Sequence, residues 1–346
     1  MSARISIYEE PGVLLAVRAV DPATPVAEQA AALLQGGLEQ GRKVLAAVED
    51  PSNPEASAIY PQLEPSTATF PELTEQIQQM LGEQKIFDSI FLMDSALRGE
   101  HANDPEVWML AASVYELVRM YTLAAPLLEK ALPVFDGLRK SAVEIRLARA
   151  WGRSGKREGV ADLVRASQSC EELPQAMRIE GLLLIAMTQE KAEALETLDE
   201  LLDAAEEHLG DHRIAAEALE LHADLLSDDD AQKAQQFYLA AGKMLLRLQD
   251  PYFFGLNERL VVHHLRHSEM EIALQLSQEM FTLLKQSQAP AIAHVPFLVF
   301  ASWVHQQQGD AERAGYALKG AQEIDPEETA RVQANLQQAL ATPVKT

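Results

Sequence analysis

The sequence predicts an all-α protein built as a solenoid, in which short helices form pairs and the pairs stack side by side. Residues 72–340 are rich in Ala, Leu, Glu and Gln, and their apolar residues recur at three- and four-residue spacing, which is typical of amphipathic helices. The helices come in pairs separated by brief turns, and the pairs recur at intervals of about 34 to 41 residues, a period typical of helical repeat proteins.

The clearest repeat is residues 105–138, with large residues at Trp108 and Tyr115. The small residues Ala112, Ala124 and Ala131 stand where two antiparallel helices must approach closely. This unit resembles the tetratricopeptide repeat (TPR) family. The resemblance implies a right-handed superhelical α-solenoid with a concave groove that binds other polypeptides.

A second good match is residues 295–326, where Gly309, Ala314 and Ala321 hold the small positions and Asp325-Pro326 closes the unit. Weaker copies lie between and before these two units. Their expected starts are near Phe70, Ser141, Gln175, Ala215 and Phe254. We therefore expect about seven TPR-like helical hairpins.

The remaining segments flank the repeats. In residues 1–50 the stretches 5–20 and 43–48 read as strands or as a degenerate helical hairpin, and we favour helix, so this segment is predicted to be helical and possibly partly β. The prolines of residues 51–71 predict an extended linker, or an arm that Tyr60 and Phe70 pin to the body. The predicted organisation is an N-terminal segment 1–50, a linker or arm 51–71, a solenoid 72–326, and a capping helix with a tail 327–346.

Composition narrows the function classes. The net charge of −23 opposes binding to nucleic acid or to an anionic membrane and favours a basic or neutral protein partner. The single cysteine, Cys170, fits a reducing compartment, and no apolar run is long enough to span a bilayer, so we expect a cytoplasmic protein without membrane insertion. No catalytic or cofactor-binding motif is present, so we predict that the chain is not an enzyme and holds no cofactor.

A cluster of basic residues stands out in this acidic chain. Arg146, Arg149 and Arg153 recur at three- and four-residue steps, so they share one helix face. One interpretation is a site for an acidic or phosphorylated segment of a partner, because guanidinium groups bind carboxylates and phosphates in paired geometry. The alternative is that neighbouring repeats supply carboxylates to these arginines.

Two other charged clusters have plain structural interpretations. His263, His264 and His267 are too few for a metal site without further ligands, so we predict no metal, and a polar or half-buried helix face explains them. The acidic run at residues 190–230 reads as a solvated outer face, although it also gives the chain a lengthwise charge gradient that favours partner orientation or self-association.

In TPR domains the first helix of each repeat lines the concave groove. The resemblance places Gly255, Glu258 and Val262 at groove positions. It also predicts an apolar groove surface, unless the repeat register is displaced by one or two residues and the apolar side chains named next belong to the core. The apolar partner-binding candidates are Met109, Ile145, Ile179, Leu183 and Leu219.

These observations predict a scaffold or adaptor that binds a partner polypeptide in its groove. The chaperone-binding clamp of the family is missing, since only Arg146 occupies a suitable place. A second hypothesis is an accessory subunit that contacts a larger assembly through charged outer faces, and a remote third is a helical metal-dependent enzyme. The sequence does not identify the partner.

Overall fold

The computed structural model describes residues 3–10, 13–39, 43–50, 57–287 and 289–341. The chain divides into two compact units, Met1–Thr188 and Gln189–Thr346. No helix within the described ranges is long and apolar enough to cross a bilayer.

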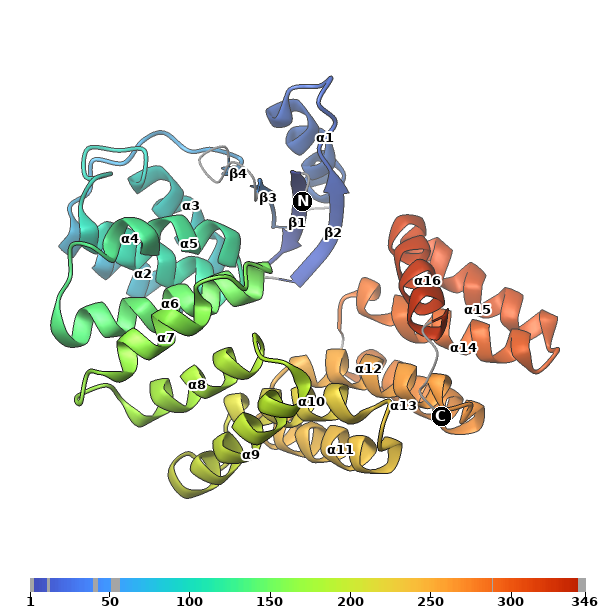
Figure 1. Cartoon of the computed structure of the whole chain (residues 1–346). Helices are drawn as coiled ribbons and strands as arrows, with labels where there is room; N and C mark the ends of the chain where they lie inside the picture. The colour runs from blue at the N-terminus through green and yellow to red at the C-terminus, as the bar shows by residue number, and fades with distance from the viewer. Residues whose placement is uncertain (1–2, 11–12, 40–42, 51–56, 288, 342–346) are drawn as a thin grey trace. The chain divides into compact units, whose positions relative to one another are not determined.

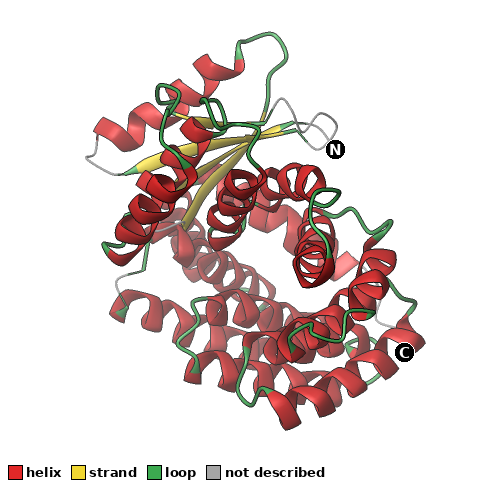
Figure 2. Cartoon of the chain, turned by 90° about the vertical axis from the view of Figure 1, so that its left-hand side faces the viewer, coloured by secondary structure: helices red, strands yellow, loops and turns green. Residues whose placement is uncertain are grey.

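The first unit begins with a four-stranded antiparallel sheet, shown yellow in Figure 2. Its strands lie in the order β2-β1-β3-β4. The elements are β1 (Arg4–Glu9), β2 (Val13–Ala19), α1 (Val26–Glu39), β3 (Val44–Glu49) and β4 (Ala58–Tyr60). Both faces of the sheet are covered, because every residue of β3 is buried.

Alternate side chains of the sheet enter two different hydrophobic cores, because successive residues of a strand point to opposite faces. Ile5, Ile7, Val44, Ala46 and Val48 form one core with Ala30 and Leu34 of α1. Tyr8, Leu45, Ala47 and Ile59 join the core of the first helical hairpins. The sheet is therefore packed between α1 and the repeats.

Our preference for helix at residues 5–20 and 43–48 is wrong, because these stretches form β1, β2 and β3. For residues 43–48 the physical reason is the burial of β3. A strand buried on both faces is apolar throughout and lacks the alternation that identifies a half-buried strand. Helix α1 is the helical part of the N-terminal segment.

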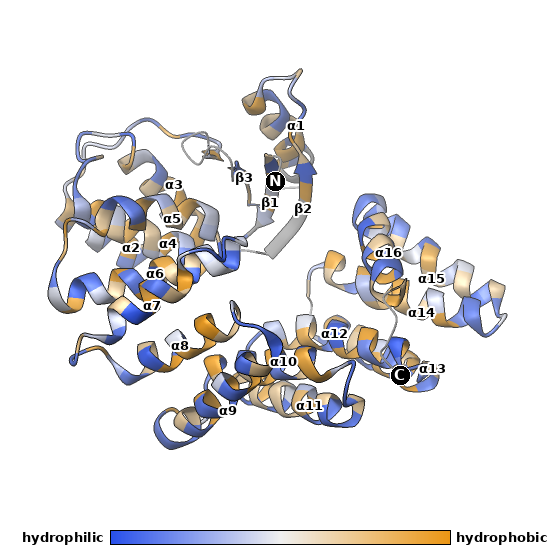
Figure 3. Cartoon of the chain, viewed as in Figure 1, coloured by the Kyte–Doolittle hydropathy of each residue, from blue (hydrophilic) through white to orange (hydrophobic). Residues whose placement is uncertain are grey.

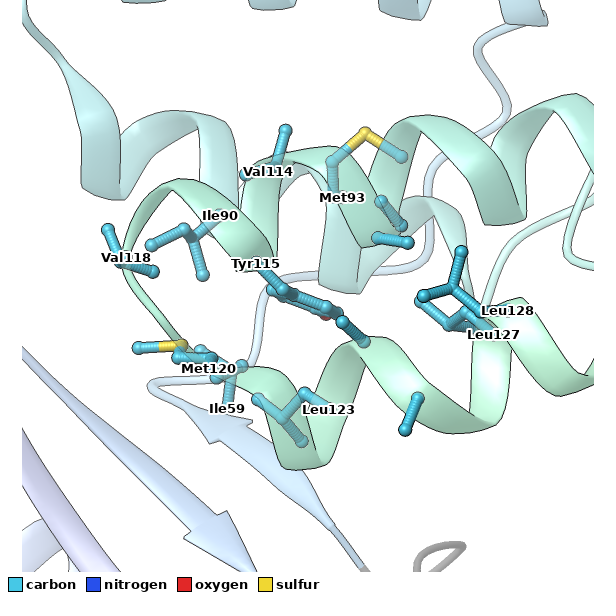
Figure 4. Packing of buried hydrophobic residues seen from close by; sticks show 14 of the residues in the cluster. Ile59, Ile90, Met93, Val114, Tyr115, Val118, Met120, Leu123, Leu127 and Leu128 are labelled. Carbon is cyan, nitrogen blue, oxygen red and sulfur yellow. The ribbon is translucent and has the colours of Figure 1, made fainter. Parts of the chain in front are cut away.

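The rest of the first unit consists of helices that pair in sequence order (Figure 1). They are α2 (Phe70–Gly82), α3 (Ile86–Ala96), α4 (Pro105–Leu117), α5 (Tyr121–Ala131), α6 (Gly137–Ser154), α7 (Val160–Gln168) and α8 (Gln175–Ala186). Ala112, Ala124 and Ala131 are fully buried, as expected for small residues at close helix contacts. Figure 4 shows Tyr115 among Met93, Leu127 and Leu128, with Ile59 of β4 close to Met120 and Leu123.

The predicted linker is only partly described, because residues 51–56 lie outside the described ranges. Tyr60 ends β4 and packs against the core shared with α1, and Phe70 begins α2 and packs against the core of the hairpins. The segment between them is tied to α3: Arg98 donates to the Leu63 carbonyl at 2.8 Å, and the Ser66 amide donates to the Ser95 carbonyl at 3.1 Å.

The second unit consists of further paired helices and a final helix. They are α9 (Lys191–His208), α10 (Arg213–Leu226), α11 (Ala231–Arg247), α12 (Tyr252–Arg266), α13 (Met270–Gln286), the 3-10 turn η2 (Ala291–His294), α14 (Val295–Gln307), α15 (Ala311–Ile324) and α16 (Pro326–Ala341). Figure 3 shows polar and apolar stretches alternating along these helices, as in amphipathic helices. Helix α16 packs against α12, α14 and α15.

The predicted repeat starts agree with the observed helices. Phe70, Gln175 and Val295 begin α2, α8 and α14. The predicted starts near Ala215 and Phe254 fall inside the first turns of α10 and α12, and the start near Ser141 falls in the second turn of α6. Gly309, a predicted small position, has φ 80°, the left-handed conformation that favours glycine at the end of a helix.

Candidate partner-binding site

The predicted anion-binding arginines form bridges within the first unit. Arg146 of α6 donates to Glu116 of α4 at 2.9 Å and to Ser113 at 3.0 Å. The side chains of Arg146 and Glu116 are only 14% and 12% exposed. Arg146 is thus already engaged by the preceding hairpin.

Arg149 has the same kind of partner on the following hairpin. Its guanidinium makes a two-pronged bridge to Glu180 of α8. Burial lowers the pKa of Arg149, but the hydrogen bonds and charge of Glu180 outweigh that effect and raise its pKa. The interpretation that neighbouring repeats supply the carboxylates holds for Arg146 and Arg149. Arg153 is exposed and also takes part in an interaction, so the three residues do not form an open anion site.

The predicted apolar groove is largely core. Ile145 is fully buried in a cluster with Val164 and Leu184, and Ile179 and Leu183 are buried as well. Met109 and Leu219 are half-buried and pack against the cores of their own units. The prediction of exposed contacts at Ile145, Ile179 and Leu183 is therefore wrong. These three side chains belong to the core, which is the alternative that the sequence left open.

The three histidines have partners within the second unit. His263 shares a 2.8 Å hydrogen bond with Ser227, His267 donates to the Ser227 carbonyl at 2.9 Å, and His264 pairs with Glu269 at 2.6 Å. Burial and the two neighbouring histidines lower the pKa of His263 to about 4. Within the described residues no three His, Cys, Asp or Glu side chains gather as metal ligands.

A polar cavity of about 620 Å³ lies within the second unit. It is lined by α10, α11, α12, α14 and α16. Gly255, Glu258 and Val262 of α12, all predicted groove positions, line it. Phe300 of α14 and Val332, Asn335 and Leu336 of α16 complete much of the wall. This cavity is the best candidate for a binding site in the second unit.

Two ion pairs hold the charged wall of this cavity. Arg259 of α12 pairs with Asp224 of α10, and Arg266 lies 2.6 Å from Asp228. Tyr238 donates its hydroxyl to Asp224, and burial together with that carboxylate raises the pKa of Tyr238. These acids and bases balance one another and fix the positions of the helices.

Glu258 is different, because it makes no hydrogen bond or ion pair in the described part of the chain. Desolvation raises its pKa to about 7, although the charges of Arg331 and Arg259 oppose the shift and Glu328 adds to it. Arg331 and Glu328 belong to α16, where they pair with each other at 2.7 Å. An ionised Glu258 therefore has no ion-pair partner among the described residues, and a cationic group that enters the cavity would supply one.

Only the wall of this cavity that α12 forms was predictable from the sequence. The groove register identified Gly255, Glu258 and Val262, but it gave Glu258 no role. The opposite wall comes from α16, more than seventy positions later in the chain. A capping helix was expected there, but no sequence signal shows that it would lean against α12 and α14.

Comparisons with known proteins bear on the fold. No protein-family model matches the sequence, and no curated protein matches it. A tetratricopeptide repeat protein from Parabacteroides merdae is 14% identical, with a TM-score of 0.50, over 79% of this chain and 97% of that one.

Two further structures are similar at lower scores. BtubC from P. vanneervenii is 16% identical over 65% of this chain and 92% of that one, with a TM-score of 0.47. A Rap protein complexed with competence and sporulation factor is 16% identical over 78% of this chain and 76% of that one, with a TM-score of 0.46. Together with the order of paired helices described above, the match to the Parabacteroides merdae protein shows that this chain has a TPR-like helical repeat fold.

Proposed function

We propose that this protein is a protein-binding scaffold, and that its second unit holds a basic residue of a partner polypeptide against Glu258. The fold supports the first part, since stacked helical hairpins leave surfaces open to other chains. The single observation that carries the second part is a half-buried carboxylate without a partner in a cavity large enough for a side chain.

Electrostatics favour a lysine or arginine in this cavity. Withdrawal from water strengthens the attraction between the Glu258 carboxylate and an entering cation, because the local dielectric is lower than that of bulk water. The net charge of −23 also attracts basic partners at long range and speeds their association.

The apolar part of the wall suits the stem of such a side chain. Val262, Phe300 and Leu336 line the same cavity as Glu258. Long basic side chains commonly bury their methylene groups along apolar surface while the charged head finds a polar partner. A long basic side chain therefore matches both the charged and the apolar parts of the cavity.

The earlier hypothesis of an acidic or phosphorylated partner segment has less support. It depends on Arg146, Arg149 and Arg153, and a ligand would have to displace Glu116 and Glu180 from two of them. Self-association and contact through the acidic outer face stay predictions.

The proposal is tested by fluorescence anisotropy with the labelled peptide Ac-Ala-Leu-Lys-Leu-Ala-NH2 and the full chain. We expect the lysine peptide to bind at least about tenfold more tightly than the same peptide with Gln in place of Lys, the difference of a charge-assisted contact. The variant Glu258→Gln should remove that preference.

The matched control is Glu193→Gln, which removes one charge from the exposed face of α9. It should bind the lysine peptide as the wild type does. Equal binding by Glu258→Gln and wild type would overturn the site. An equal loss in both variants would instead indicate attraction to the acidic surface as a whole and would favour the accessory-subunit hypothesis.

A further inference from the structure

A second pocket of about 580 Å³ lies between helices α13, α14 and α15 and the turn η2. It shares no residue with the polar cavity. Helix α14 contributes Leu298 to this pocket and Phe300 to the cavity, two positions apart and thus on roughly opposite sides of the helix. The two sites are therefore separate.

The wall of this pocket is mostly apolar. Phe281 and Leu284 come from α13, Leu298 from α14, and Ala317 and Ile324 from α15. At its rim Tyr316 is 83% exposed, which is unusual for so large an aromatic side chain. An exposed apolar surface with a depression of this size is typical of a contact site.

One buried polar atom faces no partner in this apolar setting. His294 is only 8% exposed, and its ring packs edge-on against Phe281 with 5.1 Å between centroids. Its Nδ1 lies 3.1 Å from the Ala291 carbonyl oxygen, which only accepts, so Nδ1 carries the hydrogen. In the neutral ring Nε2 is then a bare acceptor, and it is buried with no hydrogen-bond partner.

This arrangement specifies the ligand group. A buried acceptor without a partner costs free energy. Nε2 is closed off from water, so a ligand donor recovers that free energy by displacing the side chains that cover the atom. The donor must sit on a flat apolar body that fills the pocket, and the indole of Trp and the phenol of Tyr have this combination. Aliphatic side chains and Phe lack the donor.

The rim adds a charge preference. Lys285 stands over the Phe281 ring at 4.5 Å, and Lys319 lies 3.6 Å from Glu323. Both lysines are exposed, in a chain whose net charge is −23. A carboxylate beside the entering aromatic residue would meet Lys285, and a second one would compete with Glu323 for Lys319.

We propose that the pocket bounded by His294, Leu298 and Gly320 binds a Trp or Tyr side chain of an acidic partner segment, which donates a hydrogen bond to His294 Nε2. This site is additional to the cavity around Glu258 and does not depend on it. The protein thereby has two contacts of opposite charge preference within one unit.

The chain offers a variant that closes the pocket without disturbing its walls. A Cβ at Gly320 would meet only Leu298 Cδ1, at 3.8 Å, which is an ordinary van der Waals contact. The longer side chain of Gly320→Leu therefore extends into the pocket without a clash at Cβ. Leucine also favours helix over glycine. Gly315→Leu is the matched control, because it lies on the same helix with no atom within 4 Å of its Cβ and outside the pocket.

The experiment uses the full chain and the labelled peptide Ac-Glu-Asp-Trp-Asp-Glu-NH2 in anisotropy titrations. We expect binding to weaken by about tenfold when Trp is replaced by 1-methyltryptophan, which loses only the donor, and also when Asp and Glu become Asn and Gln. Gly320→Leu should abolish binding, whereas Gly315→Leu should retain it.

Other outcomes overturn the proposal. Equal binding of the Trp and 1-methyltryptophan peptides would exclude the hydrogen bond to His294. Unchanged binding by Gly320→Leu would place the peptide elsewhere. If no peptide binds and Gly320→Leu converts an associated wild-type chain to monomer in sedimentation velocity, the occupant is a second copy of this chain.

Discussion

Both units pair arginines with carboxylates of neighbouring helices, but the second unit also contains a half-buried carboxylate without such a partner among the described residues. In the first unit Arg149 is fixed by Glu180 of the next hairpin, and Arg146 by Glu116 of the preceding one. In the second unit Glu258 faces a cavity and has no such partner among the described residues. A charged side chain on the first helix of a repeat can therefore either form an ion pair between hairpins or stay available to a ligand. The outcome depends on whether a neighbouring helix places an opposite charge within reach.

The largest effect is expected from breaking the bridge in the first unit. Glu180→Ala leaves the Arg149 guanidinium half-buried without its main counter-charge, so the free energy of unfolding should fall by about 3 kcal/mol. Urea unfolding followed by circular dichroism measures this change.

The double variant Arg149→Leu, Glu180→Leu should recover most of that loss, because no charge then stays buried. Arg165→Ala is the control, since the pair of Arg165 with Asp162 is highly exposed and should contribute less than about 0.5 kcal/mol. A loss in Glu180→Ala no larger than this control would show that the bridge is a surface pair.

A smaller and pH-dependent effect is expected at Glu258. Its pKa of about 7 in the folded chain lies above the ordinary value of 4.5, so folding favours the protonated form. Stability from this group is present below pH 4.5 and is lost as the pH rises through 7. The shift sets an upper limit of about 3 kcal/mol, and we expect a smaller loss than in Glu180→Ala because Glu258 is only half-buried and water enters the cavity.

Glu258→Gln removes this pH dependence, because glutamine does not ionise. The free energy of unfolding of the variant, relative to that of the wild type, should therefore be higher at pH 8 than at pH 4.5. Urea unfolding at both pH values measures it. Binding of the lysine peptide should show the opposite trend and strengthen from pH 6 to pH 8, because only the ionised carboxylate pairs with a cation. A constant difference at both pH values would contradict the raised pKa.

The smallest effect is expected at Arg331, whose charge lowers the pKa of Glu258 from the neighbouring helix α16. Arg331→Gln should move the midpoint of the pH dependence upward by about 0.5 pH unit, as expected for an exposed charge. The midpoint is obtained from the pH profile of lysine-peptide binding. No movement would indicate that α16 and α12 are further apart in solution.

Much of the fold was predictable, because it depends on local patterns. The small residues Ala112, Ala124 and Ala131 identified the hairpins, and the starts at Phe70, Gln175 and Val295 were placed correctly. Strand was kept only as the alternative at residues 43–48 because β3 is buried on both faces, so its apolar residues carry no alternation from which a strand is recognised.

The sites were less predictable, since they depend on pairs of residues far apart in the chain. The arginine spacing was read correctly as one helix face, but Glu116 and Glu180, some thirty residues away on either side, decide whether that face is free. His294 gave no signal at all, because its importance comes from the absence of a donor near Nε2 and not from its sequence neighbours.

The N-terminal sheet has a consequence for how this chain can be shortened. Tyr8, Leu45, Ala47 and Ile59 cover apolar side chains of the first hairpins that a stack of repeats would otherwise present to water. A terminal repeat needs a polar outer surface to stay soluble, and here a β-sheet provides the cover that a polar helix commonly gives. A truncated chain that starts at the first helical hairpin would expose this surface and would be prone to aggregation, so the sheet and the repeats should be expressed together.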